Sequence, residues 1–504
     1  MNLSKYTLKN ISRENVVVPG EQMFELPEKV LQFGTGVLLR GLPDYFIDKA
    51  NRQEIFNGRI VLVKSTAKGD ASSFEQQDGL YTLCERGIEN GEKISLNIIN
   101  SSVSRVLIAH THWSEILKCA HNRELKIIIS NTTEVGIELV EDDIRQSPPG
   151  SYPGKLLAFL YERFKTFKGS ADSGFVIIPT ELIPDNANKL KGIILKLANL
   201  NSLEIDFIGW IEKHNYFCNS LVDRIVTGMP GEEVRNTIEN ELGYTDELLT
   251  VSEVYSLWAI EGDETIRSIL SFAEADKSVV IEPNIDLHRE LKLRLLNGTH
   301  TLTSGLAFLA NYETVLSTME DKLTESFIAD LMKNELAPSI PYKIDDATKQ
   351  AFIIKVLDRF RNPHINHPWK NITLNYTSKI RTRCIPMLLN FYKNNGKPPV
   401  LFSLGFAAYL YFMKGTKQIG KDIYGEKNGE QYLIEDPMAN KLYDFWQKRS
   451  VVAVVDDVLK DESLWGADLS VLPGFQTIVT NNLNDIISNG MKATLENTYT
   501  TKSV

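Results

Sequence analysis

Three side chains that together could serve proton transfer to a substrate oxygen lie close together in the segment 289–300. Lys292, Asn297 and His300 offer an ammonium, an amide and an imidazole, and the apolar residues and helix formers between them predict a helix. At about 100° per residue, with Lys292 as zero, His300 falls near about 80° and Asn297 near about 140°. One half of the helix surface could then present a proton donor, a hydrogen-bond donor and an orienting group to a carbonyl that receives a hydride.

Each of these residues also has a simple structural interpretation. A single lysine on a helix usually lies on a solvated face, and a single histidine is more often structural than catalytic, so the segment alone is only a hypothesis. However, the spacing of these residues resembles the signature of the polyol-specific long-chain dehydrogenases, the mannitol dehydrogenase family. Asn297 follows Lys292 by five positions, and His300 follows Asn297 by three. The resemblance implies that Lys292 is the catalytic acid/base and that Asn297 and His300 belong to its site.

The size and composition favour a protein of two domains that acts on small molecules. With 504 residues the chain is too long for one hydrophobic core, and 43% apolar with 24% charged residues is ordinary for a globular protein. A formal net charge of −10 argues against nucleic acid or an anionic membrane as a partner. An anionic small substrate would need a local basic pocket.

The cysteines and apolar runs favour a cytoplasmic location. The four cysteines are scattered without paired spacing, which argues against a disulfide framework and against a structural metal site. The N-terminal residues have no apolar core of a signal peptide, and the longest apolar run, 401–413, is shorter than the ~20 residues of a membrane span. We see neither heptads nor an interface stripe, and we expect a monomer or weak oligomer.

The pattern of elements predicts an α/β fold with a Rossmann-like N-terminal domain and a mainly α-helical C-terminal domain. Strand-length apolar runs alternate with amphipathic helical patterns up to about residue 280, and helix-period stretches dominate from about 287. We place the NAD-binding domain at 1–285 and the substrate and catalytic domain at 286–504. The expected strands are 30–33, 60–63, 106–109, 126–130 and 175–179; the expected helices include 113–120, 153–167, 289–311, 314–335, 344–360, 384–395, 401–413 and 437–448, with an exposed loop at 414–430.

The first predicted strand runs into a glycine turn that suits a dinucleotide. Phe33, Gly34, Thr35 and Gly36 follow it directly, and two glycines would let backbone N–H groups approach a pyrophosphate. The third glycine of the usual fingerprint is absent, so ordinary packing glycines at a strand-to-helix turn remain an alternative. The family has a GxGxxxR version of this turn, and the resemblance assigns Arg40 to the phosphates.

Two neighbouring positions leave the details of cofactor binding open. Pro43 either begins a helix or interrupts one. The second strand ends without an acid for the adenosine ribose, and Lys64 and Ser65 there would tolerate a 2′-phosphate. The resemblance favours NAD over NADP. Asn131 and Thr132, within the segment 130–134, suit ribose or carboxamide contacts, although a capped turn explains them equally well.

Two acids carry over as substrate contacts from the resemblance. Glu181 follows the strand 175–179, at the edge where α/β sheets bind ligands, but the family has Asn there. An ionised carboxylate would repel an alkoxide, so Glu181 either is protonated, or interacts with Lys292, or contacts a sugar hydroxyl. Asp223 lies in the segment 215–225, which resembles the family's N-x-F-x-x-S-M-V-D-R-I, and the resemblance implies a contact to a substrate hydroxyl.

Three cations follow one another at Lys379, Arg381 and Arg383. The segment 376–380 resembles the family's G-S-S-K segment, which carries Lys379 over as a substrate contact, whereas the family's arginine eight residues earlier is Asn371 here. Cations at every second residue on one face would form a carboxylate receptor, because arginine pairs with carboxylates in a bidentate fashion. A solvated basic turn is the competing interpretation.

Together, the resemblance implies an NAD-dependent dehydrogenase without a metal, and the arginines favour a sugar acid over a neutral polyol as substrate. An enzyme of the same family that acts on a neutral polyol, or on another sugar acid such as fructuronate, remains the closest alternative. A catalytically silent NAD-binding sensor is a further alternative, against which the intact Lys292, Asn297 and His300 argue.

Overall fold

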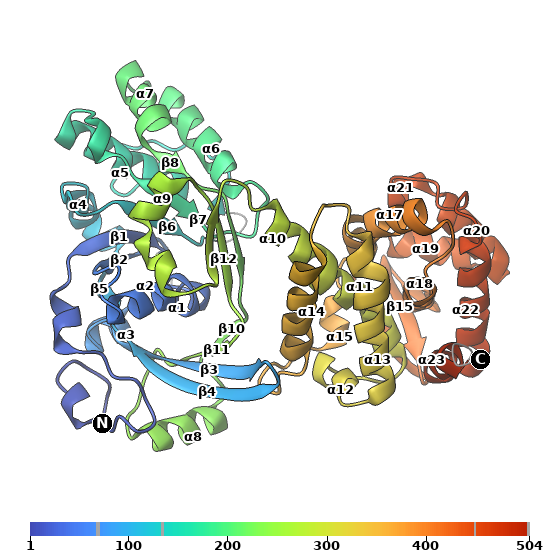
Figure 1. The fold of residues 1–504 in the computed structure, drawn as a ribbon. Helices are drawn as coiled ribbons and strands as arrows, with labels where there is room; N and C mark the ends of the chain where they lie inside the picture. Colours follow the sequence, from blue (N-terminus) through green and yellow to red (C-terminus); the bar gives the residue numbers. More distant parts are fainter. Residues whose placement is uncertain (67–70, 133–135, 448–449, 501–504) are drawn as a thin grey trace. The chain divides into compact units, whose positions relative to one another are not determined.

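The computed structural model describes residues 1–66, 71–132, 136–447 and 450–500. Thr133 and Glu134, in the segment expected near the nicotinamide half, and residue 448, at the end of an expected helix, lie outside the described residues. The chain divides into two compact units, unit 1 with residues 1–87 and 93–285 and unit 2 with residues 88–92 and 286–504 (Figure 1). Unit 1 is α/β and unit 2 is mainly helical, which confirms the predicted fold class. Among the described residues, no helix is long and apolar enough to cross a membrane.

The centre of unit 1 is a six-stranded sheet with the strand order β5-β2-β1-β6-β7-β8, and its neighbouring strands are parallel. Its strands are β1 (Glu28–Phe33), β2 (Arg59–Lys64), β5 (Val103–Ile108), β6 (Ile127–Ser130), β7 (Val176–Pro179) and β8 (Tyr216–Phe217). The order reverses between β1 and β6, and such a switch point is where doubly wound sheets bind ligands. All five expected strands are confirmed within two or three residues, except that Ala109 begins a helix.

Helices cover both faces of this sheet because side chains alternate along each strand. Val30 of β1 packs with α2, whereas Leu31 and Phe33 pack with α4, α5 and α6 in a separate core (Figure 1). The covering helices are α2 (Pro43–Arg52), α4 (Ala109–Cys119), α5 (Tyr152–Phe167), α6 (Asn186–Leu200) and α7 (Ile205–His214).

Two smaller sheets complete unit 1. Their strand orders are β10-β11-β3-β4 and β13-β12-β9. The strands are β3 (Tyr81–Glu89), β4 (Glu92–Asn100), β9 (Ser220–Asp223), β10 (Val226–Gly228), β11 (Thr250–Glu253), β12 (Leu257–Glu261) and β13 (Val279–Glu282), and the remaining helices are α1 (Val37–Gly41), α3 (Ser72–Gln76), α8 (Glu232–Leu242) and α9 (Glu264–Ile269).

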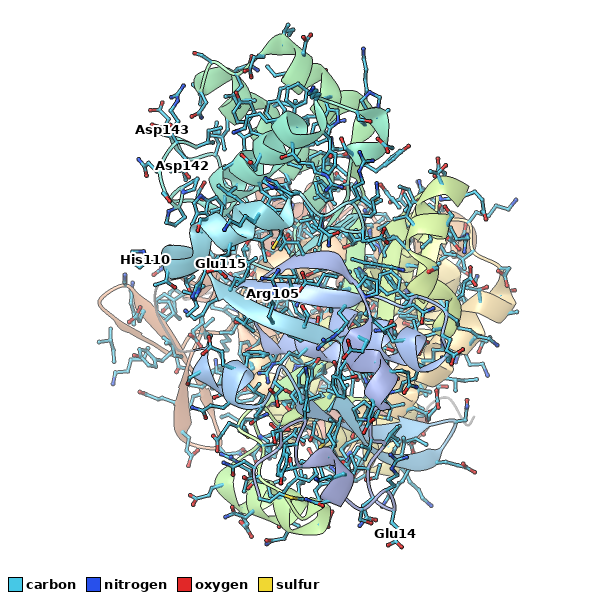
Figure 2. All side chains as sticks on the ribbon, turned by 90° about the vertical axis from the view of Figure 1, so that its left-hand side faces the viewer. Glu14, Arg105, His110, Glu115, Asp142 and Asp143 are labelled. Carbon is cyan, nitrogen blue, oxygen red and sulfur yellow. The ribbon has the colours of Figure 1, made fainter. Side chains whose placement is uncertain are left out.

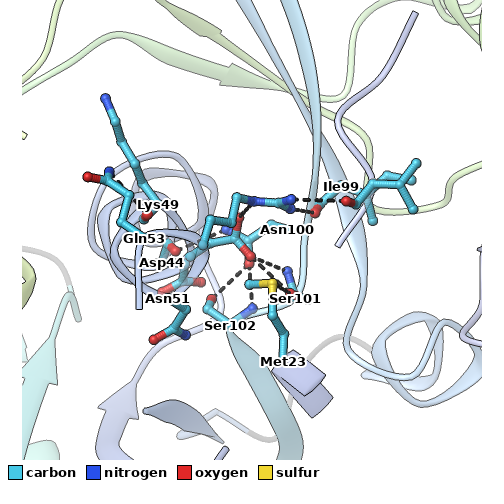
Figure 3. A network of polar contacts seen from close by, with 12 residues as sticks. Met23, Asp44, Lys49, Asn51, Gln53, Ile99, Asn100, Ser101 and Ser102 are labelled. Carbon is cyan, nitrogen blue, oxygen red and sulfur yellow. Dashed lines mark hydrogen bonds and ion pairs between the residues drawn. The ribbon is translucent and has the colours of Figure 1, made fainter. Parts of the chain in front are cut away.

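A buried polar network fixes α2, the helix after the glycine turn, against the end of β4 (Figure 3). The carboxylate of Asp48 accepts hydrogen bonds from the Ser101 N–H (2.8 Å), the Ser101 hydroxyl (3.0 Å) and Arg52 Nε (2.6 Å). Arg52 also donates to the carbonyls of Val18 and Ile99, at 3.2 and 2.6 Å. Buried charges are tolerated when they are paired and hydrogen-bonded in this way. The network therefore gives α2 a defined position relative to β4.

Charged side chains lie on β5 and on the helix that follows it. Arg105 of β5 pairs with Glu28 of β1 at 2.8 Å, and His110 and Glu115 are exposed on the following helix, α4 (Figure 2).

Unit 2 consists mainly of helices with unusual π-helical segments. The α-helices are α10 (Asp286–Leu291), α11 (Gly298–Leu309), α12 (Val315–Met319), α13 (Lys322–Asp330), α14 (Asp346–Phe360), α15 (Trp369–Ile372), α16 (Tyr376–Lys379), α17 (Ile385–Asn395), α18 (Val400–Phe412), α19 (Ala439–Trp446), α20 (Val451–Lys460), α21 (Glu462–Trp465), α22 (Phe475–Asn489) and α23 (Met491–Thr500). Three π-helices, Lys292–Asn297, Leu331–Leu336 and Ile380–Cys384, interrupt or extend them. The expected helix 314–335 is therefore three successive pieces.

The prediction of an exposed loop at 414–430 is wrong. This segment contains the strands β14 (Lys417–Ile419) and β15 (Asp422–Lys427), which form an antiparallel sheet with β16 (Glu430–Leu433). Asn428 and Gly429 both have positive φ, 53° and 83°, as the tight turn between β15 and β16 requires. Many lysines and glycines suggested a loop, but an Asn-Gly turn is a hairpin signal that outweighs such composition.

Candidate functional site

The glycine turn after β1 has a backbone that only glycine can adopt at its first position. Gly34 has a φ of 127°, and its N–H donates to the Val63 carbonyl of β2 at 3.0 Å. A Cβ at Gly34 would lie 2.9 Å from the Asn131 carbonyl oxygen and 2.8 Å from Leu39. The turn therefore passes directly over the end of β6, at the switch point of the sheet.

The second glycine is subject to a different constraint. Gly36 has an extended backbone with a φ of −68°, which any residue adopts, and a Cβ there would meet no protein atom within 4 Å. Gly36 is exposed, Thr35 beside it is half-buried, and α1 begins directly after them. The absence of a side chain leaves space at the start of a helix, where backbone N–H groups can receive a phosphate.

Pro43 begins a helix, as one of the two alternatives predicted, and it also follows a break in the helical segment, as the other predicted. The short helix α1 ends at Gly41, Leu42 leaves the helical region with a φ of −132°, and Pro43 then occupies the first turn of α2. The turn is therefore followed by one helical turn and a break. The break directs the chain into α2, which the Asp48 network holds.

Arg40, at the end of α1, is held by protein contacts. Its Nη1 donates to the Leu248 carbonyl at 2.5 Å, and its guanidinium lies 5.8 Å from the Tyr81 ring and 6.0 Å from the Phe74 ring. Burial lowers the pKa of Arg40, although the nearby acids, including Asp44, oppose that effect. The residue as a whole is partly exposed, whereas its Nε is buried and has no hydrogen-bond partner among the described residues.

The carboxylate of Glu181 holds the segment that follows β6. It accepts hydrogen bonds from the Thr132 N–H (2.9 Å), the Thr132 hydroxyl (3.0 Å) and the Ser130 hydroxyl (3.2 Å). Asn131, between them, donates its amide to the hydroxyl and carbonyl of Thr180 at 3.0 and 3.2 Å. Burial raises the pKa of Glu181, and these hydrogen bonds oppose the shift. Glu181 therefore positions the ends of β6 and β7 relative to each other.

Asp223 and its neighbour Arg224 are buried at the end of β9. Arg224 forms an ion pair with Glu85 and donates to the carbonyl of Gly41 at 2.6 Å, at the end of α1. This explains Arg224 as a structural residue that connects β9 to the glycine-turn segment.

In unit 2, the helix that carries Lys292, Asn297 and His300 is present, but its predicted geometry is wrong. Residues Lys292–Asn297 form a π-helix, and the Gly298 N–H bonds to the carbonyl five residues before it. In this pattern a residue five positions along lies about one turn further on, so Asn297 lies above Lys292 and not about 140° away from it. His300, three residues later in α11, lies beside Asn297. All three residues are partly exposed, although the Nε2 atom of His300 is buried.

His300 is held by aromatic contacts. Its ring stacks on Phe360 at 4.3 Å with an angle of 13°, and the rings of His367 and Trp369 meet it edge-on at 5.1 and 5.9 Å. Burial, with the charges of His367, Arg359, Arg383 and Lys379, holds the pKa of His300 well below its usual range. The imidazole is therefore neutral near pH 7, and its Nε2 has no hydrogen-bond partner among the described residues.

The prediction that Lys379, Arg381 and Arg383 share one face is wrong. Alternate residues share a face in a strand, whereas Lys379 ends α16 and the two arginines lie in the π-helix Ile380–Cys384. Arg381 is exposed and donates to the Ser463 carbonyl at 3.2 Å, whereas Arg383 donates to the Thr301 hydroxyl at 3.2 Å. Of the three cations, Lys379 and Arg383 are the two whose charges help to lower the pKa of His300.

Lys379 and Arg383 form a pair of like charges. Burial and the Arg383 guanidinium lower the pKa of Lys379 to about 8, and Asp436 partly opposes this. The Lys379 Nζ donates to the Ile372 carbonyl at 2.9 Å. Two half-buried cations held near each other attract an anion, since an anion relieves their repulsion.

With this geometry established, comparison with known proteins assigns the family. Residues 28–271 match the mannitol dehydrogenase Rossmann domain, and residues 284–487 match the mannitol dehydrogenase C-terminal domain. The chain belongs to the mannitol dehydrogenase family. It is an oxidoreductase of the polyol and sugar-acid class.

Among relatives in this family, the altronate oxidoreductase of Halalkalibacterium halodurans is 36% identical over 93% of this chain and 92% of its own. The altronate oxidoreductase of Bacillus subtilis is 37% identical over 94% of this chain and 95% of its own. In the Pseudomonas fluorescens mannitol 2-dehydrogenase ternary complex with NAD and D-mannitol, the chain is 22% identical, with a TM-score of 0.68 and 99% coverage of both chains. A substrate-free D-sorbitol dehydrogenase is 19% identical, with a TM-score of 0.79, covering 98% of this chain and 100% of that chain. The two solved structures confirm the fold.

Three neighbours of the candidate site in this family member were not predicted from the sequence. Phe360 and His367 pack on His300, and Arg294 donates to backbone carbonyls of the π-helix Ile380–Cys384. Phe360 and His367 belong to segments far along the chain, so no local pattern points to them. Arg294 carried a signal, because it is a charged residue in an otherwise apolar run.

Proposed function

We propose that this protein interconverts D-tagaturonate and D-altronate with NADH or NAD, in the breakdown of hexuronates. The support is the identity of 36 to 37% to altronate oxidoreductases over more than nine-tenths of the chain. The observation that favours a carboxylated substrate in this acidic protein is the pair of half-buried cations, Lys379 and Arg383, beside His300.

The residues of unit 1 suit NAD. Gly34 and Gly36 leave room for the pyrophosphate at the start of α1, and the Arg40 guanidinium at the end of this helix can pair with its oxygens. Phe33 and Thr35 shape the same turn. Asn131 and Thr132 follow β6, where their backbone and side-chain groups can meet the ribose and carboxamide. NADH, when bound, supplies the hydride for reduction of the keto carbon.

In unit 2, Lys292, Asn297 and His300 divide the proton chemistry. The Lys292 ammonium gives a proton to the substrate oxygen as the carbonyl becomes an alcohol, and takes it back in the reverse direction. The Asn297 amide, one π-turn above, donates a hydrogen bond to the same oxygen as its negative charge develops. The neutral His300, held by Phe360, orients this oxygen without adding a second positive charge.

The other groups hold the substrate. Arg383 and Lys379 bind the carboxylate, because charge-assisted hydrogen bonds to a carboxylate are strong and directional. Asp223 binds a hydroxyl group of the substrate. Glu181 helps to bind the substrate hydroxyl groups chiefly by keeping Thr132 in position through two hydrogen bonds. Arg381, which is exposed and turned to Ser463, contributes to the electrostatic attraction of the substrate and not to contact with it.

The test measures NADH oxidation with D-tagaturonate, D-fructuronate and D-fructose in parallel. We expect the highest kcat/KM with tagaturonate and loss of turnover with all three on Lys292→Met, with unchanged far-UV circular dichroism. Preference for fructuronate would make the protein a fructuronate reductase, and preference for fructose a mannitol 2-dehydrogenase. NADH binding without turnover of any of the three would indicate a silent NAD-binding sensor.

A further inference from the structure

Two π-helices of unit 2 carry most of the proposed proton and carboxylate chemistry, and they pack against each other. Lys292–Asn297 carries the proton donor, and Ile380–Cys384 carries Arg383. The buried side chain of Arg294 connects their backbones. Its Nη1 donates to the carbonyls of Thr382 and Arg383 at 2.7 and 2.9 Å.

The need for this guanidinium follows from Pro386. In an α-helix the N–H of residue 386 would donate to the carbonyl of residue 382, but proline has no N–H. Pro386 lies in the first turn of α17, where the π-helical hydrogen-bond pattern gives way to the α-helical one. The Thr382 carbonyl therefore lacks its α-helical donor, and Arg294 supplies one from the other helix.

Glu290 fixes the guanidinium in this position. Its carboxylate accepts from Arg294 Nε at 2.9 Å, one helical turn before it, and the side chain of Arg294 is almost fully buried. The pair therefore neutralises the buried charge while two of the hydrogen bonds remain directed at the second π-helix.

A second connection runs through Thr301. Arg383 Nη1 donates to the Thr301 hydroxyl at 3.2 Å, and this hydroxyl donates to the Asn297 carbonyl at 2.7 Å. Arg294 and Thr301 thus join the same two segments at two points. The Thr301 hydroxyl therefore joins the side chain of Arg383 to the backbone of Asn297.

We propose that Arg294 is a positioning residue, which substitutes for the missing N–H of Pro386 and keeps the Lys292–Asn297 turn in register with Arg383. Its catalytic consequence rests on the proposed function. Because small displacements of reacting groups cost up to about 100-fold in rate, loss of this connection lowers kcat and leaves cofactor binding, which belongs to unit 1, unchanged.

The experiment is a double-mutant cycle on the full-length protein. We expect Arg294→Met to lower kcat about 10- to 100-fold with an unchanged Kd for NADH. Pro386→Ala restores an N–H that can donate to the Thr382 carbonyl. The double variant Arg294→Met/Pro386→Ala therefore recovers at least a third of the decrease in log kcat that Arg294→Met causes. The matched control is Arg235→Met on α8, which removes an arginine paired with Glu239 at the same four-residue spacing and leaves kcat unchanged.

Amide hydrogen exchange tests the connection without activity. Arg294→Met increases exchange in both 292–301 and 380–387, and the added Pro386→Ala reverses part of the increase in the second segment. If Arg294→Met does not fold, Arg294→Lys, which keeps the charge but reaches one carbonyl only, shows the same pattern to a smaller degree. A wild-type protein that turns over no sugar acid but shows this coupled exchange would refute the proposed function and not the connection. The proposed connection would be overturned if Arg294→Met did not increase exchange in both segments. It would also be overturned if the double variant had a kcat no higher than that of Arg294→Met.

Discussion

Gly34 and Gly36 differ in a way that separates protein stability from cofactor binding. Gly34 combines a φ of 127° with a missing Cβ that would lie 2.9 Å from the Asn131 carbonyl, whereas Gly36 has an ordinary φ and an open space. Replacing each by alanine therefore changes different quantities. Gly34→Ala should lower the free energy of unfolding, and Gly36→Ala should lower the affinity for NADH while the fold remains intact.

The magnitudes follow from the two environments. For Gly34→Ala, the backbone region alone costs about 1–3 kcal/mol, and the contact with Asn131 adds to it because a backbone carbonyl cannot rotate away. For Gly36→Ala, the lower chain entropy of the unfolded state stabilises the protein by up to about 1 kcal/mol. The added methyl group, however, takes the space of a phosphate that would accept backbone hydrogen bonds worth about 1.5–3 kcal/mol. The Kd for NADH should then rise roughly 10- to 100-fold.

The assay combines thermal unfolding with NADH titration by fluorescence on both variants and the wild type. Gly34→Ala should lower Tm by several degrees, and Gly36→Ala should leave Tm within about 2 °C of the wild-type value or raise it slightly. If Gly36→Ala bound NADH with wild-type affinity, the pyrophosphate would not pass over this turn. A Gly34→Ala protein with unchanged Tm would show that the turn relaxes without strain.

Three further changes test unit 2. Arg383→Met should raise the KM for the sugar acid about 10- to 100-fold with little change for fructose, because only the sugar acid loses a charge-assisted hydrogen bond; equal losses for both would refute the carboxylate role. Since the pKa of Lys379 is lowered to about 8, its ammonium is present below that pH and lost above it. The KM for the sugar acid should therefore rise between about pH 7 and 9, and Lys379→Met should flatten this rise. Glu335→Gln should cost about 1–3 kcal/mol in unfolding free energy with unchanged kcat, because the buried carboxylate accepts the N–H groups of Leu401 and Phe402 at the start of α18; guanidinium unfolding measures this.

The α/β fold could be predicted because burial on both faces leaves a direct trace in sequence. Strands such as 30–33 and 60–63 are continuous apolar runs, and the glycine turn after the first of them is a short-range signal. The hairpin at Asn428 and Gly429 carried an equally short-range signal, which the high lysine and glycine content of 414–430 obscured.

The geometry of the candidate site could be predicted only in part. The types and order of Lys292, Asn297 and His300 were readable, but their angles were not, because an α-helical period was assumed for a segment that is π-helical. The Thr382 carbonyl in the second π-helix accepts from Arg294, which is far away in sequence, so local spacing could not indicate this contact. For the same reason, Arg381 and Arg383 looked equivalent in sequence but have different neighbours in the fold.

The contrast between the overall charge and the local cations bears on how a sugar acid is selected. A net charge of −10 repels anions at long range, but at physiological ionic strength this repulsion is screened beyond about 8 Å. Lys379 and Arg383 are half-buried, so their attraction acts at contact distance, where screening is weak. Added salt should consequently change the association rate of the substrate more than the turnover of the bound complex, and discrimination between a carboxylate and a hydroxymethyl group should depend on these two side chains and not on the field of the whole protein.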